Sequence, residues 1–136
     1  MADYSRMAKT LCMTFSGKGG QQVVELLESG YRGEFVALRI LRESRLPLLA
    51  GDLAKKMNVS TARVAALIRA LARKKYLRHA RAQSDGRKVV LELTEQGRQA
   101  LEEREREVWS FTENALMKLT PEEAAQFVAA AQKLFG

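Results

Sequence analysis

Positively charged side chains are concentrated in the middle of this 136-residue chain, and their spacing indicates a binding surface. The segment 52–88 holds eleven Lys or Arg residues and two acidic residues, whereas the whole chain carries a net charge of +7. The remaining residues are therefore slightly acidic. A concentrated basic segment favours a polyanionic partner such as nucleic acid. The alternative is that the charges only solvate one face of a helix.

The helix predicted at residues 61–75 has two contrasting faces. At about 100° per residue, one face collects the apolar residues and should lie in the core. These core residues are Val64, Leu67, Ile68 and Leu71. The opposite face is small and basic and consists of Ala62, Ala66, Arg69 and Arg73, with Arg63 and Ala70 at its flank. Alanines allow a helix to approach base edges in a major groove about 12 Å wide, where Arg can reach guanine.

The beginning of this helix supports the same interpretation. Ser60 is a strong N-cap, and Thr61 follows it in the first turn. Three residues after the cap, Arg63 stands where a capping box would place Glu or Gln. Because a cation does not stabilise the positive end of a helix, Arg63 is interpreted as a base contact, with a solvated arginine as the alternative. Ser60 and Thr61 are assigned to the same DNA-binding surface.

A basic hairpin is predicted after this helix. Strands are expected at 77–80 and 88–93, and Asp85-Gly86 between them favours a tight turn because both residues tolerate positive φ. The tip carries Arg81, Asp85, Arg87 and Lys88. These residues either flank an ordinary soluble turn or form a basic wing that lies along a minor groove, whose negative potential attracts arginine.

The remaining elements complete a mainly α fold with a small β-hairpin wing. Two helices around a short turn form a helix-turn-helix, and the hairpin after it makes a winged helix. N- and C-terminal helices at 1–33 and 95–136 are expected to mediate dimerisation around a DNA-binding domain at 34–94. The other predicted elements are helices at 3–16 (stopped by Gly17, Gly19 and Gly20), 21–29, 34–44, 52–57, 95–119 and 121–135, and an extended segment at 46–49. Thr94 is predicted to cap the helix at 95–119, and Thr120-Pro121-Glu122-Glu123 is a capping box that opens the last helix.

Several function classes are excluded by composition. One cysteine and one histidine provide neither an internal disulfide nor an ordinary zinc site, so no metal or cofactor is expected. The segment 16–20 is similar to a phosphate-binding loop, but Lys18 is followed by Gly19 rather than Ser or Thr. No catalytic constellation can be assembled, so an enzyme is not expected. Because no apolar run approaches the length of a membrane helix and no export signal is present, the predicted location is cytoplasmic.

The order of these residues resembles the MarR family of bacterial winged-helix transcriptional regulators. The resemblance covers about 35–100, and Tyr76 stands where the family commonly has glycine. It implies a homodimer with interlocking terminal helices, a recognition helix in each major groove, Arg87 in the minor groove and Asp85 bracing the wing. Such regulators mostly repress transcription and release DNA on binding a small aromatic ligand or on oxidation. The matching segments are Leu53-Ala54-Lys55-Lys56, Val59-Ser60, Val64-Ala65-Ala66-Leu67-Ile68-Arg69-Ala70-Leu71, Lys75-Tyr76-Leu77, Asp85-Gly86-Arg87 and Leu93-Thr94-Glu95-Gln96-Gly97.

Apolar residues of the terminal helices also predict a homodimer, because one small core cannot cover them all. They include Val108, Phe111, Leu116, Phe127 and Leu134. An effector pocket for a small aromatic anion is expected at the junction of these helices with the winged helix, with an ordinary domain junction as the alternative. The residues assigned to this pocket are Phe15, Tyr31, Phe35, Arg39 and Arg42.

Cys12 lies between two apolar residues, Leu11 and Met13. A buried, inert thiol is therefore favoured over a redox sensor.

The predicted function is a sequence-specific DNA-binding transcriptional regulator, a repressor that binds double-stranded DNA at a pseudo-palindromic operator as a homodimer. The alternative is a winged-helix module for protein–protein assembly. A DNA reader should show steep salt dependence and a sequence preference, whereas an assembly module should lack the preference.

Overall fold

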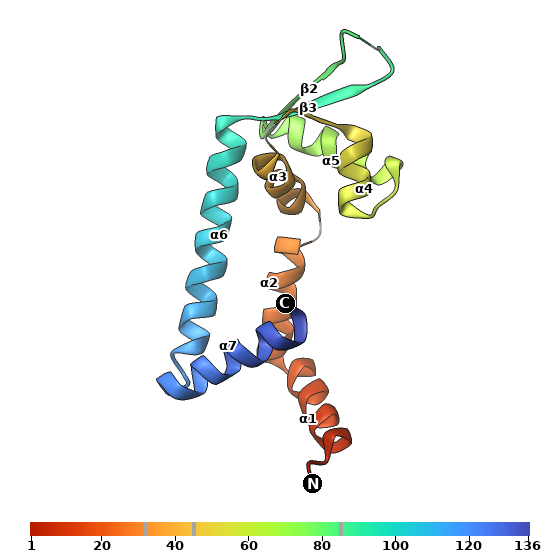
Figure 1. The fold of residues 1–136 in the computed structure, drawn as a ribbon. Coiled ribbons are helices and arrows are strands. Elements are labelled where there is room, and N and C mark those ends of the chain that lie inside the picture. Colours follow the sequence, from red (N-terminus) through yellow and green to blue (C-terminus); the bar gives the residue numbers. More distant parts are fainter. Residues whose placement is uncertain (32, 45, 85) are drawn as a thin grey trace. The chain divides into compact units, whose positions relative to one another are not determined.

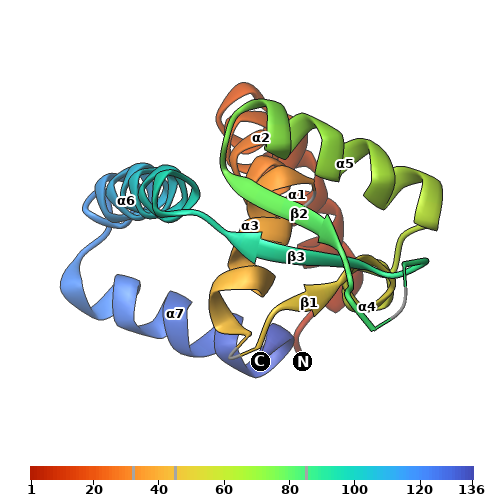
Figure 2. The ribbon, with the colours of Figure 1, turned by 90° about the horizontal axis from the view of Figure 1, so that it is seen from above.

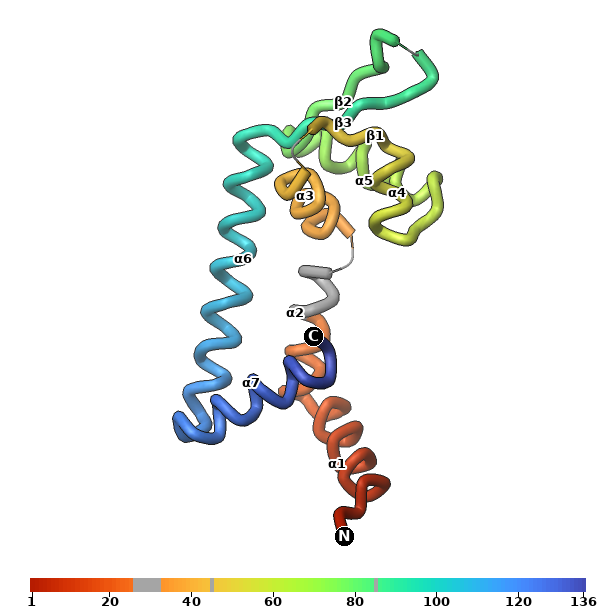
Figure 3. Tube along the Cα trace, viewed as in Figure 1, coloured from red at the N-terminus to blue at the C-terminus, as the bar shows by residue number. Residues whose placement is uncertain are grey.

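The computed structural model is mainly helical with one small sheet (Figure 1), which confirms the predicted fold class. It divides into two compact units, Met1–Arg104 and Glu105–Gly136. The structure describes the backbone of residues 1–31, 33–44, 46–84 and 86–136, and their side chains except at 26–31 (Figure 3). The elements are α1 (Tyr4–Ser16), α2 (Lys18–Tyr31), α3 (Glu34–Glu43), β1 (Leu48–Leu49), α4 (Ala50–Met57), α5 (Thr61–Arg73), β2 (Leu77–Arg81), β3 (Val89–Leu93), α6 (Glu95–Leu116) and α7 (Pro121–Phe135).

The core of the first unit joins α3, α4 and α5 to the sheet and to the first turns of α6. The predicted apolar stripe of α5 is confirmed, since Val64, Ile68 and Leu71 are buried and Leu67 is half-buried. With this face in the core, the opposite face of α5 is left exposed to solvent. The buried core residues are Ala37, Leu38, Leu41, Leu48, Leu53, Ala54, Val64, Ile68, Leu71, Leu77, Leu91 and Leu101.

The sheet is antiparallel with the strand order β1-β3-β2, and α5 lies beside it (Figure 2). The hairpin register pairs Leu77 with Leu93 and Arg81 with Val89. The extended segment predicted after α3 supplies β1, in which Leu48 pairs with Leu91. Because alternate residues of a strand share one face, buried leucines fix the sheet to the helices and leave the loop of the hairpin to project as a wing.

Of the three glycines predicted to separate the first two helices, only Gly17 does so. α1 ends at Ser16 as expected, but α2 already begins at Lys18, so Gly19 and Gly20 are helical. A Cβ on Gly20 would lie 2.4 Å from the backbone of Phe15. The glycine therefore allows α2 to turn closely against the end of α1, and packing outweighs the weak helix propensity of glycine.

The last two helices follow the predicted boundaries closely. α6 ends at Leu116, three residues earlier than expected, and α7 begins with the predicted capping box. Thr120 Oγ1 accepts a hydrogen bond from the Glu123 amide, and the Glu123 carboxylate accepts one from the Thr120 amide. These hydrogen bonds hold the pKa of Glu123 below its usual value. None of the helices in the described part of the chain is long and apolar enough to cross a membrane.

Candidate nucleic-acid interface

A short turn presents the beginning of α5 to solvent. Asn58 ends α4 in the left-handed conformation (φ 55°), as its residue type predicts. Ser60 then caps α5, because its Oγ accepts a hydrogen bond from the Arg63 amide at 3.2 Å. Ser60, Thr61 and Ala62 are all exposed, so the first turn is open to a partner.

The outer face of α5 is exposed along its length. Arg63, Ala66, Arg69 and Arg73 are exposed, and Ala70 is half-buried. Within the described residues, Arg63, Arg69 and Arg73 form no ion pair. From Arg63 to Arg73 the helix rises about 15 Å, at about 1.5 Å per residue. The face therefore offers a row of guanidinium groups with small residues between them.

The wing is held by hydrogen bonds across its loop. Arg81 Nη1 donates to the carbonyl oxygen of Gly86 at 2.8 Å, and the Ala82 amide donates to the carbonyl oxygen of Lys88 at 2.8 Å. Arg87 and Lys88 are exposed. The side chain of Arg81 therefore ties the loop together, a role that the sequence did not predict. Asp85, expected to brace the wing, lies outside the described residues.

Two further basic residues are partly neutralised by acidic neighbours. Lys74 Nζ lies 2.6 Å from Glu34 Oε2 and connects the end of α5 to the beginning of α3. Arg78 lies 3.6 Å from the Glu92 carboxylate, directly opposite it in the β2–β3 register. Neither pair was predicted from the sequence. The strand register could have indicated the second pair, whereas nothing local indicates a contact between residues forty positions apart.

The predicted effector residues lie on several elements of the first unit. Phe15 is exposed on α1, while Phe35, Arg39 and Arg42 are half-buried on α3. Phe35 packs against the core, and the Arg104 guanidinium lies 5.6 Å from its ring centroid. Arg42 lines a cavity of about 220 Å³ that Arg98 of α6 also lines. The side chain of Tyr31 lies outside the described residues.

The prediction of a buried Cys12 is wrong for the single chain. Cys12 is an exposed free thiol. Its apolar neighbours do not enclose it, because α1 buries none of its residues.

A family model described as the transcriptional regulator SarA/Rot matches residues 33–104, which make up more than half of the chain and include the winged helix. The chain belongs to the SarA/Rot family of transcriptional regulators. No curated protein sequence matches this family member.

Solved structures show the same fold at low sequence identity. MepR, a transcription regulator of the Staphylococcus aureus multidrug efflux pump MepA, is 20% identical, with 98% of this chain and 96% of MepR covered and a TM-score of 0.71. A MarR family protein from Bacillus stearothermophilus is 22% identical, with coverages of 97% and 90% and a TM-score of 0.66. Streptococcus pneumoniae FabT, solved in complex with DNA, is 21% identical, with coverages of 98% and 95% and a TM-score of 0.65.

The family match and the shared fold confirm the predicted MarR-type winged helix. This SarA/Rot family member is a DNA-binding transcriptional regulator. In this winged helix-turn-helix, the second helix of the motif is α5.

Proposed function

We propose that this SarA/Rot family member represses transcription by binding a pseudo-palindromic operator as a homodimer. It acts in the cytoplasm and has no catalytic activity of its own. One observation carries the proposal: α5 is buried along its apolar stripe and presents a small, basic, exposed face with unpaired arginines within the described residues.

The first turn of α5 supplies the base contacts. Ala62 and Ala66 are small enough to let the helix backbone approach the floor of a major groove, and Arg63 can donate two hydrogen bonds to the O6 and N7 atoms of a guanine. Ser60 and Thr61 lie beside them and can donate to phosphate oxygens. Arg69 and Arg73, further along the same face, neutralise backbone phosphates.

The wing supplies contacts in the flanking minor groove. The exposed side chains of Arg87 and Lys88 follow the loop that Arg81 holds closed. A narrow minor groove attracts such cations through its negative potential. The resemblance assigns the inserted side chain to Arg87 and the brace to Asp85.

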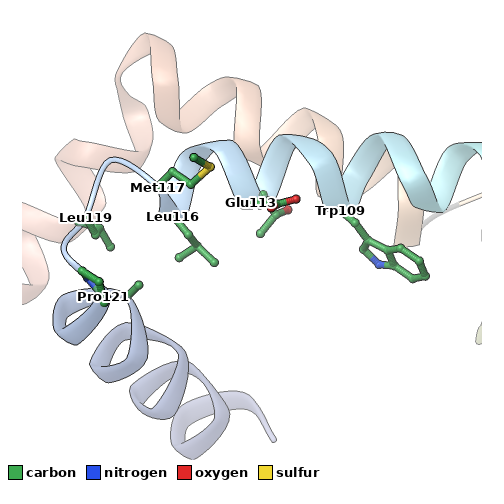
Figure 4. Close-up of a pocket in the computed structure, with 8 residues that line it drawn as sticks. Trp109, Glu113, Leu116, Met117, Leu119 and Pro121 are labelled. Atoms are coloured by element: carbon green, nitrogen blue, oxygen red, sulfur yellow. The ribbon is translucent and has the colours of Figure 1, made fainter.

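A homodimer is supported by the apolar surface of the second unit. Phe127 is 57% exposed and Leu134 is 73% exposed. A groove of about 740 Å³ runs between the end of α6 and the beginning of α7 (Figure 4), and its walls are mostly apolar. Apolar patches of this kind on small proteins mark association surfaces. The residues that line the groove are Trp109, Thr112, Glu113, Leu116, Met117, Leu119, Pro121 and Ala124.

Release of DNA is proposed to follow binding of a small aromatic anion near Phe15, Tyr31, Phe35, Arg39 and Arg42. Such a ligand acts only if it binds the DNA-competent and DNA-incompetent dimers with different affinity. Oxidation of Cys12 is the second candidate trigger, and the exposure of its thiol favours access by oxidants. Peroxide should release DNA from the wild type and fail on Cys12→Ser if the thiol is the sensor.

The proposal is tested by selecting bound sequences from a random DNA pool and titrating the selected site. Arg63→Ala should lower affinity for the selected site by about 1–3 kcal/mol per half-site and leave affinity for random DNA nearly unchanged. Arg106→Ala removes an exposed arginine from the second unit and is the matched control. If the pool yields no preferred sequence, the assembly-module alternative is supported and the repressor proposal fails.

A further inference from the structure

One hydroxyl group connects the end of α5 to the beginning of α6. Thr94 Oγ1 donates a hydrogen bond to the carbonyl oxygen of Lys75 (2.7 Å) and accepts one from the amide of Gly97 (3.0 Å). The Thr94 amide donates to the carbonyl oxygen of Tyr76 (3.1 Å). Because a hydroxyl has one proton to donate and lone pairs to accept, the same group caps α6 and holds the chain that leaves α5.

The end of α5 is shaped to present these carbonyl groups. Lys75 has a left-handed backbone with a φ of 64°. The amides of Lys75 and Tyr76 donate back to the carbonyl oxygens of Ala72 (3.0 Å) and Leu71 (2.9 Å). This pair of hydrogen bonds is a Schellman motif, which stops the helix and redirects the chain. The carbonyl groups of Lys75 and Tyr76 then meet Thr94.

Gly97 allows the first turn of α6 to lie directly on this junction. It is buried, and a Cβ at this position would lie 2.0 Å from the Tyr76 carbonyl oxygen and 2.9 Å from Leu93 Cδ1. Real Cβ atoms essentially never approach so closely. The contact therefore leaves little freedom for the first turn of α6 to move relative to the end of α5.

We propose that Thr94 is a positioning residue that sets the direction of α5 relative to α6 and thereby selects the distance between the two half-sites of the operator. The inference rests on the proposed function, because half-site spacing has meaning only for a dimer. α6 continues without interruption to Leu116 and, in the proposed homodimer, leads to the partner subunit. A change in the angle between α6 and α5 then turns each recognition helix relative to the two-fold axis.

Because of the geometry of DNA, a change in the angle between α6 and α5 can be detected as a change in the preferred spacing of the half-sites. Half-sites of helix-turn-helix dimers lie about 10–10.5 base pairs apart. One inserted base pair therefore rotates the second half-site by about 35° around the duplex axis. A dimer with a rigid junction can bind both half-sites of the longer operator only by deforming the DNA. A dimer with a loosened junction can bind both half-sites by reorienting α5.

Three substitutions separate the two roles of the Thr94 hydroxyl. Thr94→Ser keeps both hydrogen bonds and is the control. Thr94→Asp keeps an acceptor for the Gly97 amide, but its ionised carboxylate has no proton to donate to the Lys75 carbonyl. Thr94→Val has similar shape and lacks both groups. A thermal melt followed by circular dichroism identifies any variant that fails to fold, and Thr94→Asp keeps the test valid if Thr94→Val is lost.

The experiment measures affinity for an isolated half-site, for the selected operator and for the same operator with one base pair inserted. All folded proteins should bind the isolated half-site within about twofold of each other, because the exposed face of α5 is unchanged. The insertion should weaken binding by about tenfold for the wild type and Thr94→Ser, and by less than about threefold for Thr94→Asp and Thr94→Val.

Two results would overturn this inference and leave the proposed homodimer standing. One is a full tenfold spacing penalty in Thr94→Asp, which would show that Thr94 only caps α6. The other is a loss of half-site affinity in Thr94→Asp as large as its loss on the operator. A wild type that binds DNA without any spacing preference would overturn the proposed homodimer as well as the inference, so the two failures can be distinguished.

Discussion

Replacement of Gly97 by alanine should destabilise the protein, although alanine is the better helix former. The added Cβ would lie 2.0 Å from the Tyr76 carbonyl oxygen, well inside the 3.4 Å at which ordinary van der Waals contact begins. The carbonyl oxygen of Tyr76 accepts a hydrogen bond from the Thr94 amide, and the Tyr76 amide donates one to the carbonyl oxygen of Leu71. This backbone therefore cannot rotate away as the end of a flexible side chain would. The first turn of α6 or the end of α5 must move instead.

Opposing effects determine how far Gly97→Ala changes the free energy of unfolding. Alanine in place of glycine gains up to about 1 kcal/mol in helix propensity. Overpacking costs about 1–3 kcal/mol, and displacement of the junction weakens up to three hydrogen bonds of Thr94, each worth about 1 kcal/mol. We therefore expect Gly97→Ala to lower the free energy of unfolding by about 1–3 kcal/mol.

Urea unfolding at a fixed protein concentration measures this change, since the stability of the proposed dimer would depend on concentration. The midpoint should fall while the slope with denaturant stays constant. Gly51→Ala is the matched control, because Gly51 lies in α4 and a Cβ added to it would meet no atom within 4 Å. The control should be neutral or slightly stabilised. A Gly97→Ala protein as stable as the wild type would refute the close approach of α6 to Tyr76.

Three further predictions concern the cap of α5, the cap of α7 and the wing. Lys75→Gly should raise the free energy of unfolding by about 0.5–1 kcal/mol, because glycine adopts the positive φ without strain; an unchanged urea midpoint would contradict this. The pKa of Glu123 is lowered in the folded protein from 4.5, so the stabilisation from its carboxylate is present above that value and is lost as the pH falls through the lowered pKa. Glu123→Gln should remove this part of the pH dependence of stability. Identical acid-unfolding curves for the variant and the wild type would refute this prediction. Arg81→Ala should speed amide hydrogen exchange at Ala82 by about fivefold, because the loss of the bond to Gly86 costs about 1 kcal/mol; unchanged exchange would show that Arg81 does not hold the wing.

Much of the fold was predictable because local chemistry and tertiary packing agree. The apolar spacing of α5 matches its buried face, and Ser60 and Thr120 cap helices as their residue types predict. Gly17 ends α1 as predicted, but Gly19 and Gly20 were misleading, because a local rule about glycine competes with a close helix–helix contact at Gly20. The exposure of Cys12 was missed for a related reason. Apolar neighbours predict burial only when another element covers that face of the helix, and the contact of α1 with α2 leaves every residue of α1 unburied.

The candidate site was predictable where it depends on one helix and less so where it depends on long-range contacts. The periodicity of α5 indicates which arginines point outward, and the structure leaves them exposed. The partner of Lys74 on α3 and the wing contact of Arg81 require the folded chain to be known. The double role of Thr94 also required the structure. Its N-cap position is evident from the sequence, but the bond to Lys75 depends on the left-handed end of α5.

The central claim is that the exposed face of α5 reads bases, with Arg63 as its principal contact. A double-mutant cycle tests it most directly, combining Arg63→Ala with replacement of each guanine of the selected operator by 7-deazaguanine, which lacks the N7 acceptor. At one guanine per half-site, the wild type should lose affinity while Arg63→Ala should be insensitive, with a coupling energy of about 1–3 kcal/mol. Additive losses at every guanine would contradict the claim that Arg63 contacts a base.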